Sequence, residues 1–261
     1  MYSSLFSKWK LLMGILLLGQ ANLFADGQSP IGGQAAARAD QIYREAKARF
    51  NSEPTNIVAA WKFASACFDC GENAANDAGR AKYAEEGMAA AKRAMTREPK
   101  LAAAHYYLAM NIAELARTKS LGALKLVEDM EREFSIAAEL DQNFDFAGPD
   151  RNLGMLYLEA PGWPMSIGSR SKARQHLLRA AQLSPDYPEN HLNLLEAYRK
   201  WGDTEGVQRE AKKFQELLPE ARKKFSGEEW QSSWADWEKR WQAALSKMSE
   251  KSRPQSPHSR K

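Results

Sequence analysis

One spacing of residues recurs four times along this 261-residue chain and constrains the fold more than any other feature. Each copy has apolar or small residues at positions i, i+4 and i+7, and a terminating residue five positions later. Positions with this spacing lie on one face of an α-helix, so each copy predicts a helix with one buried face. The copies are Gly87-x3-Ala91-x2-Ala94-x4-Pro99, Met130-x3-Phe134-x2-Ala137-x4-Gln142, Ala173-x3-Leu177-x2-Ala180-x4-Pro185 and Val207-x3-Ala211-x2-Phe214-x4-Pro219.

A second helical pattern alternates with the first. It has large or apolar residues on one helix face, and a small residue beside them lets a neighbouring helix approach. Because the sequence is rich in Ala and Leu and has few β-branched runs, the two patterns predict an all-α fold of about four helical hairpins. The copies are Trp61-x2-Ala64-Ser65-x2-Phe68, His105-x2-Leu108-Ala109-x2-Ile112, Leu153-Gly154-x2-Tyr157 and His191-x2-Leu194-Leu195-x2-Tyr198.

Together the two patterns resemble the tetratricopeptide repeat (TPR), which follows large-x2-Leu-small-x2-Tyr with Ala-x3-aromatic-x2-Ala-x4-Pro. The copy that runs from Leu194 to Pro219 matches this pattern best. The terminators at positions 99, 142, 185 and 219 are 43, 43 and 34 residues apart, and the last interval equals the standard period. The resemblance implies a solenoid whose inner, concave face binds a partner.

Three strings between Trp61 and Gly202 carry a narrower resemblance: Ala104-His-Tyr-Tyr-Leu-Ala109, Leu153 to Ser169, and Pro188 to Tyr198. They resemble the T-component of tripartite ATP-independent periplasmic (TRAP) transporters. That resemblance implies a periplasmic protein that docks on a substrate-binding protein, often as a small homo-oligomer. Members of that family are commonly lipoproteins, whereas no Cys precedes Cys67 in this chain.

The first 25 residues have the layout of a secretory signal peptide. Lys8 and Lys10 precede the apolar run 11–18, and mostly small or polar residues follow up to Ala25, with cleavage expected after Ala21 or Ala25. The run is too short to span a bilayer, which takes about 20 residues. The sequence therefore predicts export to the periplasm and no transmembrane span in the mature chain, with an uncleaved anchor as the alternative.

Helices are also expected on both sides of the repeats. Apolar residues from Ala35 to Phe50 line one face of a helix that can cover the first repeat, and Glu53-Pro54 ends it. Near the other end, four tryptophans form one stripe, which predicts a capping helix over the open end of the solenoid. A partner-binding or self-association face is the alternative use of this stripe. The tryptophans are Trp230, Trp234, Trp237 and Trp241.

These patterns divide the chain into a signal peptide (1–25), a linker (26–34), the helical repeat domain (35–246) and a disordered basic tail (247–261). The formal net charge of +4 is concentrated at the two ends, and the part between them has 30 basic and 32 acidic residues. A nucleic-acid-binding protein needs a basic stripe on its folded part, so nucleic acid is not an expected partner.

Candidate chemical groups are few. The Cys67-x2-Cys70 spacing is also found at redox sites, where a reactive thiol lies at a helix amino terminus, but Gly71 suggests that this pair lies where its helix ends. An unreactive pair or, because export favours it, a local disulfide is expected instead of catalysis. His105 and His191 occupy packing positions of the repeat, and two Cys alone make no structural zinc site. The sequence contains no convincing catalytic or phosphate-binding motif, so we expect no enzyme activity, no cofactor and no metal.

The loop 160–171 is irregular, and its expected role is a rigid elbow with Trp163 packed on the repeats. Ser169 or Ser171 can cap the next helix, and with Arg170 they form a candidate anion site.

The repeat pattern also predicts which side chains face the concave surface. This mixed surface suits a protein partner better than a deeply buried small molecule. The alternatives are a solenoid that binds or conducts a small organic acid near Arg151 and Arg170, and a general envelope scaffold. The predicted residues are Lys62, Tyr106, Met110, Arg151, Met155, Leu158, Leu192, Glu196 and Arg199.

Overall fold

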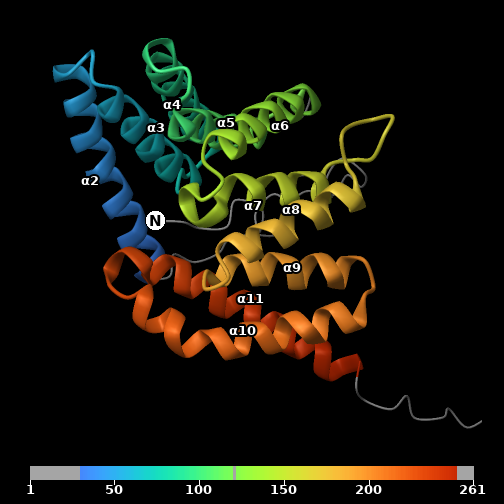
Figure 1. Cartoon of the computed structure of the whole chain (residues 1–261). Coiled ribbons are helices and arrows are strands. Elements are labelled where there is room, and N and C mark those ends of the chain that lie inside the picture. Colours follow the sequence, from blue (N-terminus) through green and yellow to red (C-terminus); the bar gives the residue numbers. More distant parts are fainter. Residues whose placement is uncertain (1–29, 120–121, 252–261) are drawn as a thin grey trace, which may run out of the picture.

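The computed structural model describes residues 30–119 and 122–251, and this part of the chain folds into helices without a β-strand (Figure 1). The all-α prediction is therefore confirmed. The helices are α2 (Pro30–Ser52), α3 (Ile57–Glu72), α4 (Asp77–Arg97), α5 (Ala102–Ala116), α6 (Ala123–Leu140), α7 (Phe144–Glu159), α8 (Arg170–Leu183), α9 (Pro188–Lys200), α10 (Thr204–Lys224), the short 3-10 helix η1 (Glu228–Trp230) and α11 (Gln231–Lys251).

The helices pack as four successive hairpins, which are α3 with α4, α5 with α6, α7 with α8, and α9 with α10. Each hairpin also packs on the next one, through α4 and α5, α6 and α7, and α8 and α9. Helix α2 covers α3, and α11 packs against α9 and touches α2, so the two ends of the array meet (Figure 1). This arrangement confirms the predicted TPR-like solenoid with a covering helix at one end and a capping helix at the other.

Small residues set the close spacing within and between hairpins. A Cβ atom on Gly154 of α7 would lie 2.6 Å from the Leu177 side chain of α8, and one on Gly87 of α4 would lie 2.2 Å from Asn111 Oδ1 of α5. Both glycines belong to the repeat patterns found in the sequence. The repeat therefore places its smallest residues where two helices approach most closely.

The tryptophan stripe caps the solenoid as predicted. Trp237 and Trp241 are buried, and Trp237 packs edge-on against Tyr187 at a ring-centre distance of 5.4 Å. Helix α10 continues through Pro219, which was predicted to terminate its hairpin, so that prediction is wrong. The extra turns bury Ala221 and place Phe225 directly after the helix, in the same apolar cluster as Trp237.

The helices also extend beyond the predicted domain limits. Helix α2 begins at Pro30, inside the predicted linker 26–34, and α11 continues to Lys251, past the predicted limit at 246. The predicted signal peptide 1–25 and the rest of the predicted tail, from 252 onward, lie outside the described residues. No helix in the described ranges is both long and apolar enough to cross a membrane.

Two buried histidines join the helices of their hairpins in the same way. His105 Nδ1 lies 2.7 Å from Glu133 Oε2, and His191 Nδ1 lies 3.0 Å from Glu210 Oε2. In both residues Nε2 faces the carbonyl oxygen of the proline that ended the preceding hairpin, at 2.8 Å and 2.7 Å. Both histidines thus have structural partners on either side of the ring.

Candidate functional site

Most of the side chains that were expected on the concave face are buried in the structure. Lys62 is exposed, and Glu196 and Arg199 are half-buried, so three of the nine lie at the surface. The expectation of a surface position is wrong for the others because α5, α7 and α9 lie inside the array and are buried on nearly all sides. The buried residues are Tyr106, Met110, Arg151, Met155, Leu158 and Leu192.

Arg151 and Tyr106 are held by the same carboxylate at the start of α7. Arg151 Nη2 lies 2.8 Å from Asp145 Oδ2, and the Tyr106 hydroxyl donates to the same oxygen at 2.5 Å. The Arg151 guanidinium also lies 5.0 Å from the centre of the Tyr187 ring. Burial raises the pKa of Asp145, and the charge of Arg151 and the hydrogen bond from Tyr106 oppose that effect. A buried arginine that is already paired in this way is not a free anion site.

The backbone next to this ion pair is left-handed over three residues. Asp145, Phe146 and Ala147 have φ values of 52°, 55° and 62°. Such a conformation costs about 1–2 kcal/mol for each residue other than glycine. Arg151 Nη1 donates to the carbonyl oxygens of Asp145 and Phe146 at 3.1 Å each, and Asn190 Nδ2 donates to that of Phe146 at 3.2 Å. These contacts assign Arg151 to holding the turn that starts α7.

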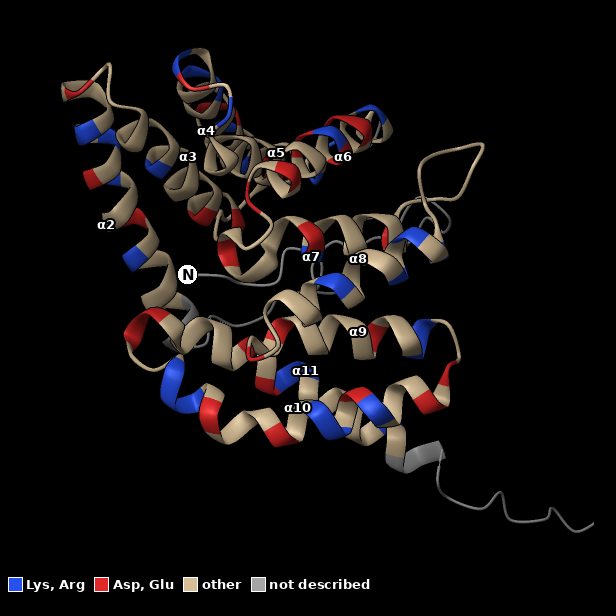
Figure 2. Cartoon of the chain, in the orientation of Figure 1, with Lys and Arg blue, Asp and Glu red and all other residues tan. Residues whose placement is uncertain are grey.

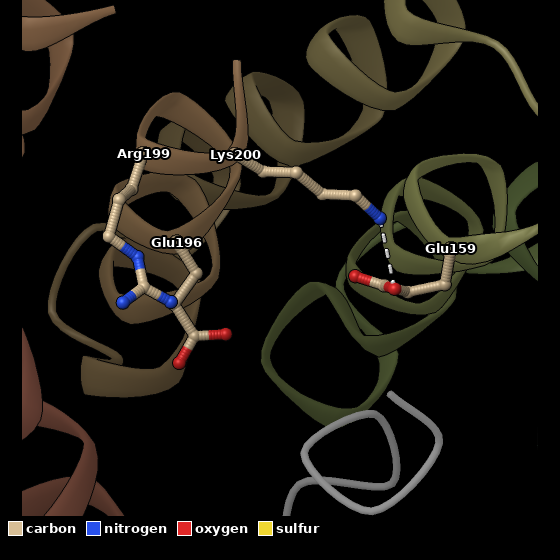
Figure 3. A pocket seen from close by; sticks show the side chains of 4 residues that line it. All are labelled: Glu159, Glu196, Arg199 and Lys200. Carbon is tan, nitrogen blue, oxygen red and sulfur yellow. Dashed lines mark hydrogen bonds and ion pairs between the residues drawn. The ribbon is translucent and has the colours of Figure 1, made fainter. Parts of the chain in front are cut away.

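Two of the predicted surface residues meet in one pocket, which we call the α7–α9 pocket. It has a volume of about 370 Å³ and is lined by Glu159 of α7 and by Glu196, Arg199 and Lys200 of α9. Figure 3 shows Lys200 extending across the pocket to Glu159, with a distance of 3.0 Å from Nζ to Oε2. The sequence reasoning missed Glu159 and Lys200, although both are the final charged residue of a helix that lines the pocket.

The α7–α9 pocket contains one positively charged and one negatively charged side chain with hydrogen-bonding capacity that the described residues leave unfilled. The Arg199 guanidinium has no ion pair or hydrogen bond with the described residues. Glu159 Oε1 is buried and also lacks a hydrogen-bond partner among them. Glu196 Oε1 accepts a hydrogen bond of 2.9 Å from Arg240 Nε, which fixes one wall of the pocket. The pocket therefore offers a donor and an acceptor to an external group.

The residues of the candidate anion site are close in space, but each has a structural role. Ser169 Oγ accepts from the backbone N–H of Lys172 at 3.4 Å, and lies 3.1 Å from Ser171 Oγ. The Arg170 guanidinium lies 5.3 Å from the centre of the Trp201 ring. The serine cap of α8 is as predicted, and anion binding there stays a prediction.

Trp163 differs from its prediction. It is 88% exposed instead of packed on the repeats. Backbone hydrogen bonds at the base of the loop, including Gly168 N to Pro161 O at 2.8 Å and Ser169 N to Tyr157 O at 3.0 Å, close the loop without this side chain.

Cys67 and Cys70 are free and buried, so the candidate disulfide is absent. Burial raises the pKa of both thiols, that of Cys70 to about 12. High thiol pKa values and burial make a thiol unreactive, as the alternative interpretation of this pair expected. In the described ranges, no three His, Cys, Asp or Glu residues are arranged to hold a metal ion.

Four stacked helical hairpins closed by a helix at each end define the class of this protein as a TPR-like solenoid. A thermophilic TPR protein of Thermus thermophilus has a similar solved structure, with a TM-score of 0.61 and 19% sequence identity, covering 82% of this chain and 95% of that one. At this identity the likeness shows the fold alone.

A second comparison covers the amino-terminal part of the array. The family described as regulator of microtubule dynamics protein 1-3 matches residues 29–147, which is less than half of the chain. No curated protein sequence matches the chain. Neither comparison names a TRAP transporter subunit. The resemblance to the TRAP T-component therefore rests on residues 104–109, 153–169 and 188–198 alone.

Proposed function

We propose that this chain is a non-enzymatic adaptor that binds a protein partner at the α7–α9 pocket. The observation that carries the proposal is the pair of unused groups in that pocket, the Arg199 guanidinium and Glu159 Oε1. A partner carboxylate or carbonyl can accept from Arg199, and a partner N–H can donate to Glu159. Buried polar atoms are costly without partners, so a complex that satisfies both is favoured.

The partner proposed for this adaptor is a periplasmic substrate-binding protein of a TRAP-type uptake system. What supports this choice is the resemblance carried by residues 104–109, 153–169 and 188–198. The layout of residues 1–25 supports export to the periplasm. The TPR-like fold supports protein binding in general, since solenoids of this class present extended binding surfaces.

Titration calorimetry with a purified candidate substrate-binding protein tests the proposal. We expect the double variant Glu159→Gln, Arg199→Ala to bind at least about tenfold more weakly than the wild type, which corresponds to about 1.4 kcal/mol. The matched control is Leu124→Ala, at a half-exposed apolar position of α6 outside the pocket. Equal affinity of the double variant and the control would contradict the proposed site, and no binding by the wild type would contradict this partner.

The Arg151 contacts argue against the alternative in which an organic acid binds beside that residue. A ligand carboxylate would have to displace Asp145, which also accepts from Tyr106. Breaking a buried ion pair is costly, so this position favours a structural role.

A further inference from the structure

The loop between α7 and α8 holds its tip in a defined shape. Gly162 and Gly168 form an isolated parallel bridge at its base. Met165 N donates to Gly162 O at 3.1 Å, which adds a turn at the tip. A Cβ atom on Gly168 would lie 2.1 Å from Ala160 O, so only glycine lets the two sides of the loop approach this closely. The tip therefore needs little ordering when it meets another surface.

This tip presents two large apolar side chains to solvent. Trp163 is 88% exposed and Met165 is 67% exposed, and the exposed Pro164 lies between them. No other large apolar side chain that the structure describes is more than 40% exposed. Two large apolar side chains exposed two residues apart on one loop form an apolar surface patch, and such patches mark sites of contact with a protein or a membrane.

The segment that contains the tip and continues into α8 has basic residues but no acidic ones. Residues 160–183 contain four Lys and Arg residues and no Asp or Glu, and all four are exposed. Figure 2 shows α8 with basic positions and no acidic ones. Acidic side chains from neighbouring parts of the array lie 3.4 to 3.8 Å from three of these bases, whereas Arg170 at the base of the loop has no ion pair with a described residue. The four are Arg170, Lys172, Arg174 and Arg179.

We propose that this loop is a membrane-contact site, at which Trp163 and Met165 enter the interfacial region of a bilayer while Arg170 and the bases of α8 contact anionic lipid headgroups. Tryptophan favours this region because its ring is apolar and its N–H is polar. Each basic side chain close to an anionic surface adds to the attraction. Such a contact would hold the adaptor beside a membrane with the α7–α9 pocket nearby, and it does not depend on which protein the pocket binds.

A fluorescent label at the loop tip tests this contact in the full chain. Met165→Cys can be labelled with an environment-sensitive maleimide because Cys67 and Cys70 are buried. Leu124→Cys, on α6, provides the control label. The labelled proteins are mixed with vesicles of phosphatidylcholine alone and with vesicles of phosphatidylcholine and phosphatidylglycerol in equal amounts. Separately, vesicle co-sedimentation compares the unlabelled wild type with the Trp163→Ala, Met165→Ala double variant.

We expect a blue shift at position 165 with the anionic vesicles, no shift at position 124, and a weaker effect at high salt. The double variant should partition onto anionic vesicles about tenfold more weakly than the wild type. An unchanged label at position 165, equal shifts at both positions, or unchanged partition of the double variant would overturn the proposal. If raising the protein concentration shifts the label at position 165 in the absence of vesicles, the loop contacts a second copy of the chain. That result would also overturn the proposal.

Discussion

His176 Nδ1 of α8 lies 2.8 Å from Asp150 Oδ1 of α7, and this pair reverses the order of imidazole and acid found in two other hairpins. Asp150 occupies the repeat position that is histidine in those hairpins, three residues before the repeat leucine Leu153. His176 occupies the position that is glutamate there. The corresponding pairs are His105 with Glu133 and His191 with Glu210. Three of the four hairpins are therefore joined by an imidazole–carboxylate contact at the same two positions.

Exchanging the two residues should preserve the contact. The single variants Asp150→His and His176→Asp place two imidazoles or two carboxylates together, and each should lower the free energy of unfolding by about 2 kcal/mol. The double variant should recover most of this loss because it recreates the arrangement of His191 and Glu210. Urea denaturation of the four proteins measures the coupling, and a double variant no more stable than the singles would refute the equivalence of the positions.

Arg151 should be essential to the stability of the fold. Arg151→Met removes the partner of a buried carboxylate and releases the left-handed turn at Asp145. The expected loss is about 3–5 kcal/mol, as for other buried ion pairs that lose one member. Arg199→Met is the matched control at a half-buried site, expected to change stability by less than about 0.5 kcal/mol. Similar denaturation midpoints for the two variants would rule out the structural role.

The contacts of Glu210 predict a loss of stability in acid. Burial alone would raise the pKa of Glu210, but hydrogen bonds from His191 and Lys213 outweigh it, and its pKa lies below the ordinary value of 4.5. A lowered pKa in the folded state stabilises the protein above the ordinary value, and this contribution is lost as pH falls through the folded-state pKa. Glu210→Gln should therefore reduce the fall in thermal midpoint between neutral pH and about pH 3. A variant with the same pH profile as the wild type would contradict this assignment.

The two thiols should resist modification in the native state. Because burial raises the pKa of Cys70 to about 12 and that of Cys67 further, neither forms much thiolate at pH 8. We expect a colorimetric thiol reagent to react with neither in native protein and with both in denaturant. Fast native reaction with either thiol would show that α3 opens at that position.

The sequence was sufficient to predict the hairpins because their spacing comes from residues that pack on one another. Gly154, for example, is small where Leu177 approaches, and the same spacing recurs in every copy. The end of α10 could not be predicted in this way, since Pro219 usually terminates a hairpin. Continuation of that helix accompanies burial of Ala221 and Phe225 in the apolar cluster that contains Trp237 of α11, and the repeat spacing does not specify this packing.

The surface was harder to predict than the core. Repeat position alone assigned Tyr106 and Arg151 to the groove, but both contact Asp145, whose left-handed backbone has no sequence signal such as glycine. Trp163 was expected to pack on the repeats as part of a rigid elbow, whereas backbone hydrogen bonds close its loop and leave the ring exposed. Such contacts depend on the path of the backbone, which periodicity does not specify.

Photo-crosslinking in the native cells tests the central claim, that the α7–α9 pocket binds a protein partner, most directly. A photoreactive amino acid replaces Lys200, which lines the pocket but is not one of the two groups proposed to bind the partner, and replaces Leu124 in the control. The adducts are identified by mass spectrometry, and we predict one discrete protein adduct at position 200 that is absent at position 124. Well-expressed, folded protein without an adduct at position 200, or with the same adducts at both positions, would contradict the claim.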